Sequence, residues 1–525
     1  MIGYQEAKVP SEVLLGRHAW EDHLYSSAWK TAPLLTEAPN QAANYFVFAD
    51  DYLAPEVLLQ LTANNAEVTL VSQGDNFAQL SDKHYQINPQ QANDFTQLLA
   101  TQFGSFGIVY LWALRDSGNV SDDSDGSTLN TVAARQCGEL LRLTQALSQV
   151  SQQCDGLWVL SEQTQAVQPD DSVINLTQST LWGMNAVLNM EQSSLSPVMI
   201  DVDKVSENIE SIASLLAHEM AATASADNTA QAHEARLAYR AGKRFIARLA
   251  EQPYQENPED QQFAIEANAS YLITGGSGGL GLKVAQHLVD QGARNLILLA
   301  RNPANPQVQT QIDALTNAGA TVRFETIDIC DQQSLSELIQ SIDDNSPLKG
   351  IIHAAGVLDD GVLQQQTEAR FEQIMQPKIQ GAWNLHQASQ SQNLDFFVMF
   401  SSLASVLGGM GQGNYAAANA FLDSLAQYRQ QQDLPALSIN WGAWSEVGMA
   451  SDMSAADIQR LEETGESLID PTQGLEIFSA LLQQPHPQVG VFPIHWTHYL
   501  SSYPTIGAFA QDISAEVTTM SDSAD

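Results

Sequence analysis

The chain has 525 residues, 44% of them apolar and 16% charged, so its length suggests two or three domain-sized units with buried cores. Its 22 basic and 61 acidic residues give a net charge of −39, which argues against nucleic acid or an anionic membrane surface as a partner. No apolar run approaches the roughly 18 residues of a membrane span, and three scattered cysteines form neither a disulfide framework nor a metal motif. With no signal-peptide pattern at the N-terminus, we expect a cytoplasmic protein that binds no metal.

Two long segments, about 45–250 and 270–500, repeat one order of apolar strands and amphipathic helices. A strand, a loop, a helix and a second strand fit residues 44–74, and the same elements fit residues 270–301. Uninterrupted apolar strands that alternate with helices indicate parallel sheets covered on both faces, with ligands at the carboxyl ends of the strands. We therefore predict an α/β protein with two tandem Rossmann-like, doubly wound parallel sheets.

The first copy is expected to be noncatalytic. Residues 49–55 (ADDYLAP) place acids and bulky side chains where a glycine-rich loop would hold a pyrophosphate. The corresponding later helix, expected over 179–192, has no tyrosine in the place that the second copy fills. In chain order, we predict an upstream linker (1–22), a degenerate structural subdomain (23–252), a linker (253–267), a catalytic subdomain (268–504) with a lid at about 446–465, and a C-terminal linker (505–525). The short ends suggest cuts through the linkers of a longer polypeptide.

In the second copy, a glycine-rich loop follows an apolar strand and opens a helix. Gly275 permits the tight turn, Gly279 lets the backbone approach a pyrophosphate, and Gly281 allows close packing of the helix. Such a loop alone is weak evidence, but its place between strand and helix of a βαβ unit favours a dinucleotide site over a flexible loop. The residues predicted to hold the phosphates are Thr274, Gly275, Ser277, Gly278, Gly279, Leu280 and Gly281.

The choice of cofactor depends on Arg301, at the end of the second strand of this copy. An acidic residue here would bind the ribose 2′-hydroxyl of NAD, whereas a guanidinium suits the 2′-phosphate of NADPH. We therefore predict NADPH; the alternative is a surface arginine that caps the strand. Further contacts are predicted at the ends of the third strand (Asp328 and Ile329, near the adenine) and of the fourth (His353, Ala354, Ala355 and Gly356, beneath the nicotinamide ribose).

Four side chains suggest carbonyl reduction. Tyr415 and Asn419 lie at i and i+4 of one expected helix, Ser402 ends an apolar strand, and Lys378 follows Pro377, where a helix is expected to start. A ketone that receives hydride also needs a proton, and a phenol with a pKa of about 10 donates reluctantly near neutrality. An ammonium group from Lys378 would lower the pKa of Tyr415, and Ser402 would hold the carbonyl. Taken singly, these residues could instead cap a strand, start a helix and carry a solvated charge.

Together these motifs resemble a known family. The glycine loop, HAAGVLDDG (353–361), PKIQGAWNLH (377–386), FSS (400–402), NYAAANAFLD (414–423) and SINWGAW (438–444) have the order and spacing of the ketoreductase domains of modular type I polyketide synthases, in the short-chain dehydrogenase superfamily. The resemblance covers about 270–450 closely, and SAWK (27–30) and EARLAYRAGKRFIARL (234–249) are similar to that family's noncatalytic subdomain.

Ordinary short-chain dehydrogenases carry a lysine four residues after the tyrosine, whereas this chain has Asn419 there. In polyketide ketoreductases the lysine and asparagine have exchanged places, and Lys378 fits the lysine on the preceding helix. The resemblance implies that Tyr415, Ser402 and Lys378 are catalytic and that Asn419 positions a water or the lysine for proton resupply. Ser401 is the neighbouring alternative to Ser402.

The resemblance also predicts the stereochemistry. Leu358, Asp359 and Asp360 match the signature of B-type reductases, which deliver a D-configured β-hydroxyl, although two aspartates could simply solvate a loop. A-type reductases carry a tryptophan where this chain has Leu407, and Ala417 stands where epimerising B-type enzymes have a proline, so a B1-like enzyme is expected. Within the lid, Met449 is the expected contact of the acyl chain.

We therefore expect NADPH-dependent reduction of a β-ketoacyl group on the phosphopantetheine of an acyl carrier protein, within a larger synthase whose other domains are further partners. Two alternatives stay open. A free-standing reductase of small ketones is disfavoured by the inactive first copy, and a redox-silent scaffold usually loses the tyrosine, the asparagine or the glycine loop.

Overall fold

The computed structural model describes residues 18–35, 44–50, 53–63, 66–102, 104–116, 121, 124–150, 153–205, 212–220, 234–255, 264–446, 448 and 453–513. No helix within these ranges is long and apolar enough to cross a membrane.

The C-terminal half contains a parallel sheet in the order β13–β12–β11–β14–β15–β16–β17. Its strands are β11 (Ser270–Thr274), β12 (Asn295–Ala300), β13 (Thr321–Thr326), β14 (Leu348–His353), β15 (Phe396–Ser402), β16 (Leu437–Trp441) and β17 (Gln488–Val491). The helices are α6 (Gly279–Asp290), α7 (Pro306–Asn317), α8 (Gln332–Gln340), α9 (Glu368–Ser389), α10 (Leu403–Leu407), α11 (Gly413–Gln430), α12 (Ala455–Glu463), α13 (Pro471–Leu481) and α14 (Trp496–Ser502). Apolar residues of α6, α7 and α13 share one buried core, and those of α8, α9 and α11 share another, so helices cover both faces of the sheet.

The N-terminal half has the same strand order, β5–β3–β2–β6–β7–β8–β9, with β4 antiparallel to β5 at the edge. The strands are β2 (Asn44–Phe48), β3 (Glu67–Gln73), β4 (Ala78–Ser81), β5 (His84–Ile87), β6 (Phe106–Tyr110), β7 (Cys154–Glu162), β8 (Pro197–Val202) and β9 (Arg236–Arg240). The labelled helices are α1 (Ala54–Ala63), α2 (Ala92–Leu99), α3 (Gly126–Leu147) and α4 (Ser179–Glu191). Two copies of one doubly wound parallel architecture confirm the predicted fold class.

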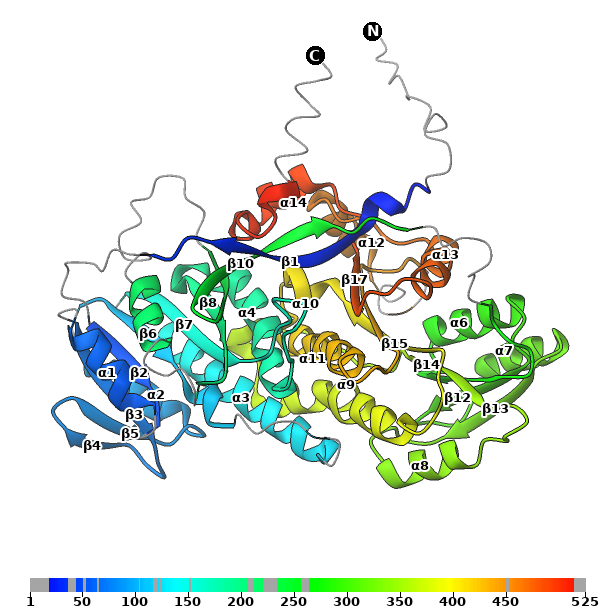
Figure 1. The fold of residues 1–525 in the computed structure, drawn as a ribbon, viewed down its shortest axis with the longest axis horizontal. Coiled ribbons are helices and arrows are strands. Elements are labelled where there is room, and N and C mark those ends of the chain that lie inside the picture. Colours follow the sequence, from blue (N-terminus) through cyan, green and yellow to red (C-terminus); the bar gives the residue numbers. More distant parts are fainter. Residues whose placement is uncertain are drawn as a thin grey trace, which may run out of the picture.

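Two further strands join the halves in a way that the sequence did not predict. β1 (Leu24–Ala32) pairs antiparallel with β10 (Lys243–Glu251), and the first residues of β1 also pair with β17. β10 also pairs antiparallel with β9. One sheet therefore runs through the whole molecule, with β1 and β10 crossing from one half to the other (Figure 1).

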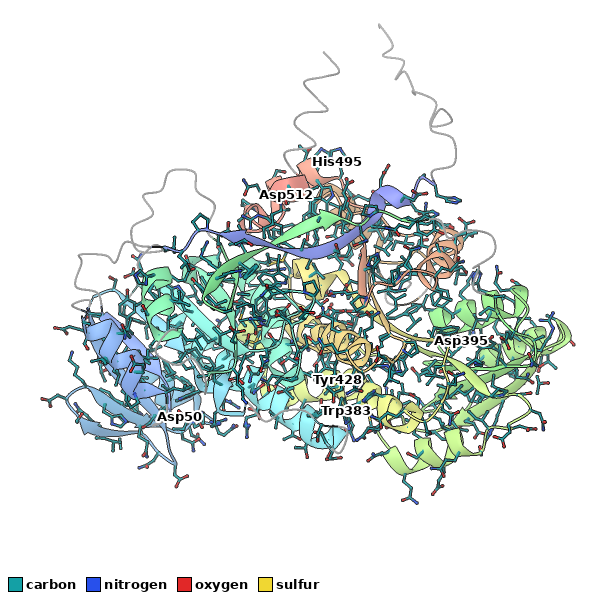
Figure 2. All side chains as sticks on the ribbon, in the orientation of Figure 1. Asp50, Trp383, Asp395, Tyr428, His495 and Asp512 are labelled. Carbon is teal, nitrogen blue, oxygen red and sulfur yellow. The ribbon has the colours of Figure 1, made fainter. Side chains whose placement is uncertain are left out.

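The inner faces of the halves meet through helices. α3 packs on α9 and α4 packs on α11, and apolar residues of all four helices belong to one buried core. Near the middle of Figure 2, Trp383 of α9 and Tyr428 of α11 lie with their ring centroids 5.8 Å apart. The first half therefore forms part of the support beneath the helices that carry Lys378 and Tyr415.

Two expectations about local structure are wrong. α9 begins at Glu368, capped by the Thr367 side chain, so Pro377 and Lys378 lie inside the helix rather than at its start. The C-terminal linker was expected from residue 505, but Phe509 and Ile513 are buried and Phe509 O accepts a hydrogen bond from Leu249 N at 2.7 Å. Residues up to 513 therefore belong to the folded part.

Candidate active site

The glycine-rich loop between β11 and α6 has the geometry that a phosphate requires. Gly275 has a φ of +70°, and a Cβ there would lie 2.9 Å from Ala354 O. A Cβ on Gly281 would collide with Gly275 O, so α6 starts directly against the turn. Gly278 caps α6 without a side-chain hydrogen bond, which leaves the N–H groups of the first turn for an anion.

Thr274 and His353 link β11 to the end of β14. Thr274 Oγ1 and His353 Nδ1 lie 2.8 Å apart, and Ala355 N donates to Thr274 Oγ1 at 3.3 Å. Burial lowers the pKa of His353 to about 3, with the charge of Lys378 acting in the same direction, so the imidazole is neutral. Both side chains are fully buried. They lie behind the 354–356 loop, and the place of His353 beneath a nicotinamide ribose stays a prediction.

The other predicted cofactor residues lie along the same carboxyl edge. Arg301 is exposed directly after β12, and Asp328 and Ile329 follow β13. Asn384 of α9 donates to Ile329 O at 3.0 Å and fixes this segment. At the other end, a Cβ on Gly356 would lie 3.1 Å from Lys378 Cε. These residues form a cradle along the carboxyl edge of the sheet, from the exposed guanidinium of Arg301 to Lys378.

Three of the predicted catalytic side chains converge beside this cradle. Ser402 ends β15, is partly exposed and caps α10 by accepting from Ala404 N at 3.2 Å. Tyr415 lies on the first turn of α11, and Asn419 follows one turn later and donates to Tyr415 O at 2.8 Å. Asn419 Oδ1 is buried and accepts no hydrogen bond from any described residue. The side chains of Ser402 and Asn419 interact with the Tyr415 hydroxyl.

Ser401, the alternative to Ser402, points elsewhere. Its Oγ donates to Asn419 O at 3.3 Å and accepts from Asn440 Nδ2 at 3.0 Å, within the protein. The geometry therefore favours Ser402 as the serine that meets a ligand.

Lys378 is buried between α9 and β15. Its Nζ donates to Phe400 O at 2.9 Å and lies 5.5 Å from the centroid of the Tyr415 ring. Burial lowers the pKa of Lys378 to about 8, against the opposing effect of Asp423. Burial likewise raises the pKa of Tyr415 to about 12, and the side chains of Asn419 and Ser402 only partly oppose this rise. The expected lowering of the Tyr415 pKa is thus wrong for this structure, because desolvation outweighs the polar contacts.

The segment with Leu358, Asp359 and Asp360 is at least partly exposed, and hydrogen bonds from α9 hold it in place. Arg370 of α9 donates to both carboxylate oxygens of Asp359 at 2.5 and 2.6 Å, and this bidentate hydrogen bonding lowers the pKa of Asp359. Asp360 accepts a hydrogen bond from Gln412 Nε2 at 3.3 Å and raises the pKa of Tyr415. The charge of Asp360 therefore acts on the candidate proton donor.

Of the two other predicted residues, Leu407 and Met449, the structure describes Leu407. Leu407 is fully buried at the end of α10, where it packs with Leu249 and Phe509. Met449 lies outside the described residues. Within the predicted lid, α12 is an exposed helix whose Ser454 and Asp457 form a capping box.

A buried polar network behind the tyrosine was not predicted. Asp423 accepts from Ser405 Oγ (2.7 Å), Ser438 Oγ (2.6 Å) and Asn440 Nδ2 (2.9 Å). Burial raises its pKa despite these bonds. Asp423 follows Tyr415 and Asn419 at four-residue intervals on α11, and this spacing is the sequence signal that could have revealed it.

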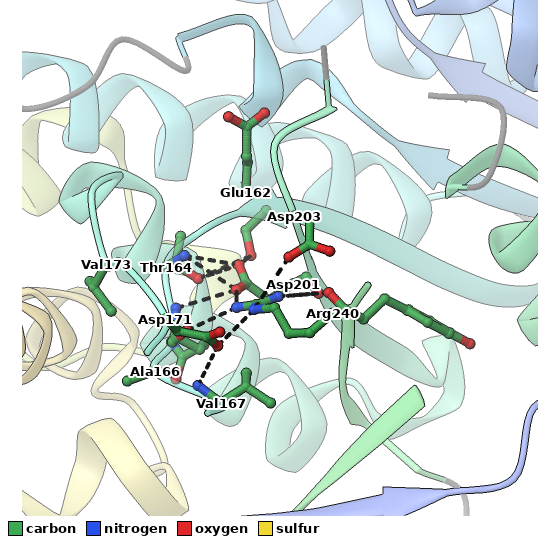
Figure 3. Close-up of polar contacts among 12 residues, drawn as sticks. Glu162, Thr164, Ala166, Val167, Asp171, Val173, Asp201, Asp203 and Arg240 are labelled. Carbon is green, nitrogen blue, oxygen red and sulfur yellow. Dashed lines mark hydrogen bonds and ion pairs between the residues drawn. The ribbon is translucent and has the colours of Figure 1, made fainter. Parts of the chain in front are cut away.

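In the first half, buried ion pairs lie at the carboxyl ends of β8 and β9. Arg240 Nη2 lies 2.5 Å from Asp201 Oδ2, and its Nε lies 2.8 Å from Asp171 Oδ2 (Figure 3). Asp201 also accepts from the hydroxyls of Ser161 and Thr164, both at 2.7 Å. This cluster places paired charges at the carboxyl ends of β8 and β9, which supports a structural role for this half.

Comparison with known proteins agrees with the geometry. Residues 269–446 match the family model described as KR domain, and residues 43–219 match one described as Beta-ketoacyl synthase-like, N-terminal. Polyketide synthase GfsB of Streptomyces halstedii is 36% identical over 324 residues, which are 61% of this chain and 5% of that protein. Phenolphthiocerol synthesis polyketide synthase type I Pks15/1 of Mycobacterium marinum is 38% identical over 225 residues, 42% of this chain and 11% of that protein.

Among solved structures, one described as the structure of A-type ketoreductases from a modular polyketide synthase matches with a TM-score of 0.76 and 25% identity. The match covers 92% of this chain and 95% of the other. By contrast, the chain spans only 5%, 4% and 8% of the length of three Streptomyces halstedii synthases.

Proposed function

Because residues 269–446 are a ketoreductase domain of the kind found in modular polyketide synthases, we propose that the protein reduces the β-keto group of a β-ketoacyl thioester carried by the phosphopantetheine of an acyl carrier protein, with NADPH as the reductant. The proposal depends on one observation. The side chains of Ser402 and Asn419 act on the Tyr415 hydroxyl, and Lys378 lies against Gly356 at the end of the cradle that begins at the glycine-rich loop. The carrier and the other domains of a synthase are proposed as partners because the curated relatives are synthases.

In the proposed mechanism, these side chains bind the carbonyl oxygen, protonate it and restore the proton. Bound NADPH would supply the hydride that reaches the β-carbon. Ser402 holds the carbonyl oxygen, and the Tyr415 hydroxyl gives that oxygen its proton. Because burial raises the pKa of Tyr415 to about 12, the phenol is fully protonated at neutral pH and its proton transfer requires help. Lys378 and Asn419 supply it: the ammonium stabilises the phenolate as it forms, and the free Asn419 Oδ1 orders a water that returns the proton.

NADPH is proposed over NADH on the position of Arg301. Its guanidinium is exposed at the end of β12, where it can reach a 2′-phosphate. NADH has a ribose hydroxyl in place of the 2′-phosphate, so with NADH bound Arg301 would have no charged partner on the cofactor.

The D-alcohol is proposed on the segment 358–360. Arg370 holds Asp359 in one position, and the charge of Asp360 acts on Tyr415, so this segment can restrict the face from which the substrate enters. The A-type description belongs to the solved relative, whereas this chain has Leu407 where A-type reductases carry a tryptophan.

The test is a turnover assay on the purified chain with NADPH and a carrier-bound β-ketoacyl thioester, followed by chiral chromatography of the product. Oxidation of NADPH that yields the D-alcohol supports both the reaction and the stereochemistry. The L-alcohol would refute only the stereochemical part. Cofactor binding without turnover of any carrier-bound substrate would refute the reductase and favour a redox-silent scaffold.

A further inference from the structure

The last residue of α4, Glu191, extends from the first half into two loops of the catalytic half. Its Oε2 accepts a hydrogen bond from the N–H of Leu363, and its Oε1 accepts one from the N–H of Gly411, both at 2.7 Å. Leu363 follows the segment with Asp359 and Asp360, and Gly411 lies in the loop before α11. One carboxylate therefore joins two loops that are far apart in the sequence.

These two loops are also bonded to each other and to the start of α11. Gly361 N donates to Gly411 O at 2.8 Å, and Asn414 Nδ2 donates to Asp359 O at 2.9 Å. The other end of the same amide, Asn414 Oδ1, accepts from Tyr415 N at 2.8 Å. A displacement of the 357–363 loop is thus passed to the 408–412 loop and to the turn that carries Tyr415.

α4 is a rigid support for this carboxylate. A Cβ on Gly183 would collide with the backbone of Ala416, and a Cβ on Gly408 would lie 2.7 Å from Ala186 O. Backbone of α4 therefore touches backbone of the catalytic half at two places. Glu191 completes this contact at the end of the helix with two charge-assisted hydrogen bonds, which are stronger than neutral ones.

The same two loops carry the exposed apolar side chains near the site. Leu358 is 38% exposed, Val362 is 39% exposed and Met410 is 53% exposed. Large apolar side chains at a surface are suited to contact an acyl chain or its pantetheine arm. The position of the loops therefore determines where these contacts stand relative to Tyr415.

We propose that Glu191 is a positioning residue for substrate orientation: it holds the 357–363 and 408–412 loops together so that the thioester approaches Tyr415 from one side. The inference rests on the proposed ketoreductase function. A glutamine at this position could accept only one of the two N–H groups, because its NH₂ would face the other donor.

The test compares Glu191→Gln and Glu191→Ala with the wild type and with Glu67→Gln. Glu67 is an exposed carboxylate of the first half that pairs with Lys83 at 2.9 Å, so it controls for loss of charge. We expect both Glu191 variants to raise KM for the thioester by about 10-fold or more, since each lost bond had a charged acceptor. We also expect a larger share of the minor enantiomer, with NADPH affinity unchanged. Glu67→Gln should match the wild type.

Amide hydrogen exchange gives a readout that needs no turnover. Peptides that cover 357–366 and 406–414 should exchange faster in both Glu191 variants, while peptides over 270–282 should not change. Unchanged exchange in the first two regions would overturn the clamp even if the wild type proved inactive. In an active wild type, folded Glu191 variants with unaltered KM and enantiomer ratio would overturn the role in substrate orientation.

Discussion

A methyl group added at Gly183 should impair catalysis although this residue belongs to the half without the candidate catalytic side chains. The new Cβ of Gly183→Ala would overlap with Ala416 O, because its distance from this oxygen would be well below 3.0 Å, the shortest contact that real Cβ atoms show. To reach ordinary contact, α4 and α11 must separate by about 1 Å. Overpacking of this kind costs about 1 to 3 kcal/mol, which outweighs the gain of about 1 kcal/mol in helix propensity.

Because Ala416 follows Tyr415 directly, the shift moves the candidate proton donor relative to Ser402. A displacement of this size can reduce the rate by on the order of 100-fold. The assay is kcat with a β-ketoacyl thioester, together with NADPH affinity and urea denaturation. Gly138→Ala is the matched control, because its methyl meets the Glu368 side chain rather than backbone. Wild-type kcat in a folded Gly183→Ala protein would refute the support of α11 by α4.

Three further outcomes are expected. Arg301→Ala should weaken NADPH binding by about 10- to 100-fold and leave NADH binding unchanged, as measured by fluorescence titration; an equal loss for both would contradict the contact with a 2′-phosphate. Lys378→Met should stabilise the fold, because burial lowers the lysine pKa from 10.5 to about 8 and this shift is a penalty of about 3 kcal/mol on the folded state. The gain is reduced by the cost of leaving Phe400 O without its donor. The penalty from the pKa shift is full below pH 8 and disappears as the pH rises toward 10.5, so a pH-independent gain in urea denaturation would contradict it. Asp201→Asn should destabilise by about 3 to 5 kcal/mol, since it removes the most buried of the carboxylates that pair with buried Arg240; a change below about 1 kcal/mol would argue that Asp171 suffices.

Local rules explain what could be predicted from the sequence. The turn at Gly275 and the close packing at Gly281 are requirements of a few neighbouring residues, so the motif alone revealed them. Tyr415 and Asn419 share a helix face for the same reason. Where two local signals competed, the choice was wrong: Pro377 suggested a helix start, but the Thr367 cap begins α9 a few turns earlier.

Non-local contacts could not be predicted. Nothing near Glu191 or Gly183 in the sequence indicates Gly411 or Ala416, because the fold alone brings these segments together. The continuous sheet has the same origin, since β1 meets both β10 and β17 across nearly the whole chain. Burial is also a property of the whole fold, and for this reason the sequence did not predict that burial raises the pKa of Tyr415.

The central claim is that Tyr415 gives the proton in a carbonyl reduction. The most direct test is Tyr415→Phe in the turnover assay with NADPH and a carrier-bound β-ketoacyl thioester, beside a titration of NADPH binding. Loss of the hydroxyl should reduce kcat by about 100- to 10,000-fold, as expected for general acid catalysis, while NADPH affinity stays the same. A variant that binds NADPH and keeps wild-type kcat would contradict the account.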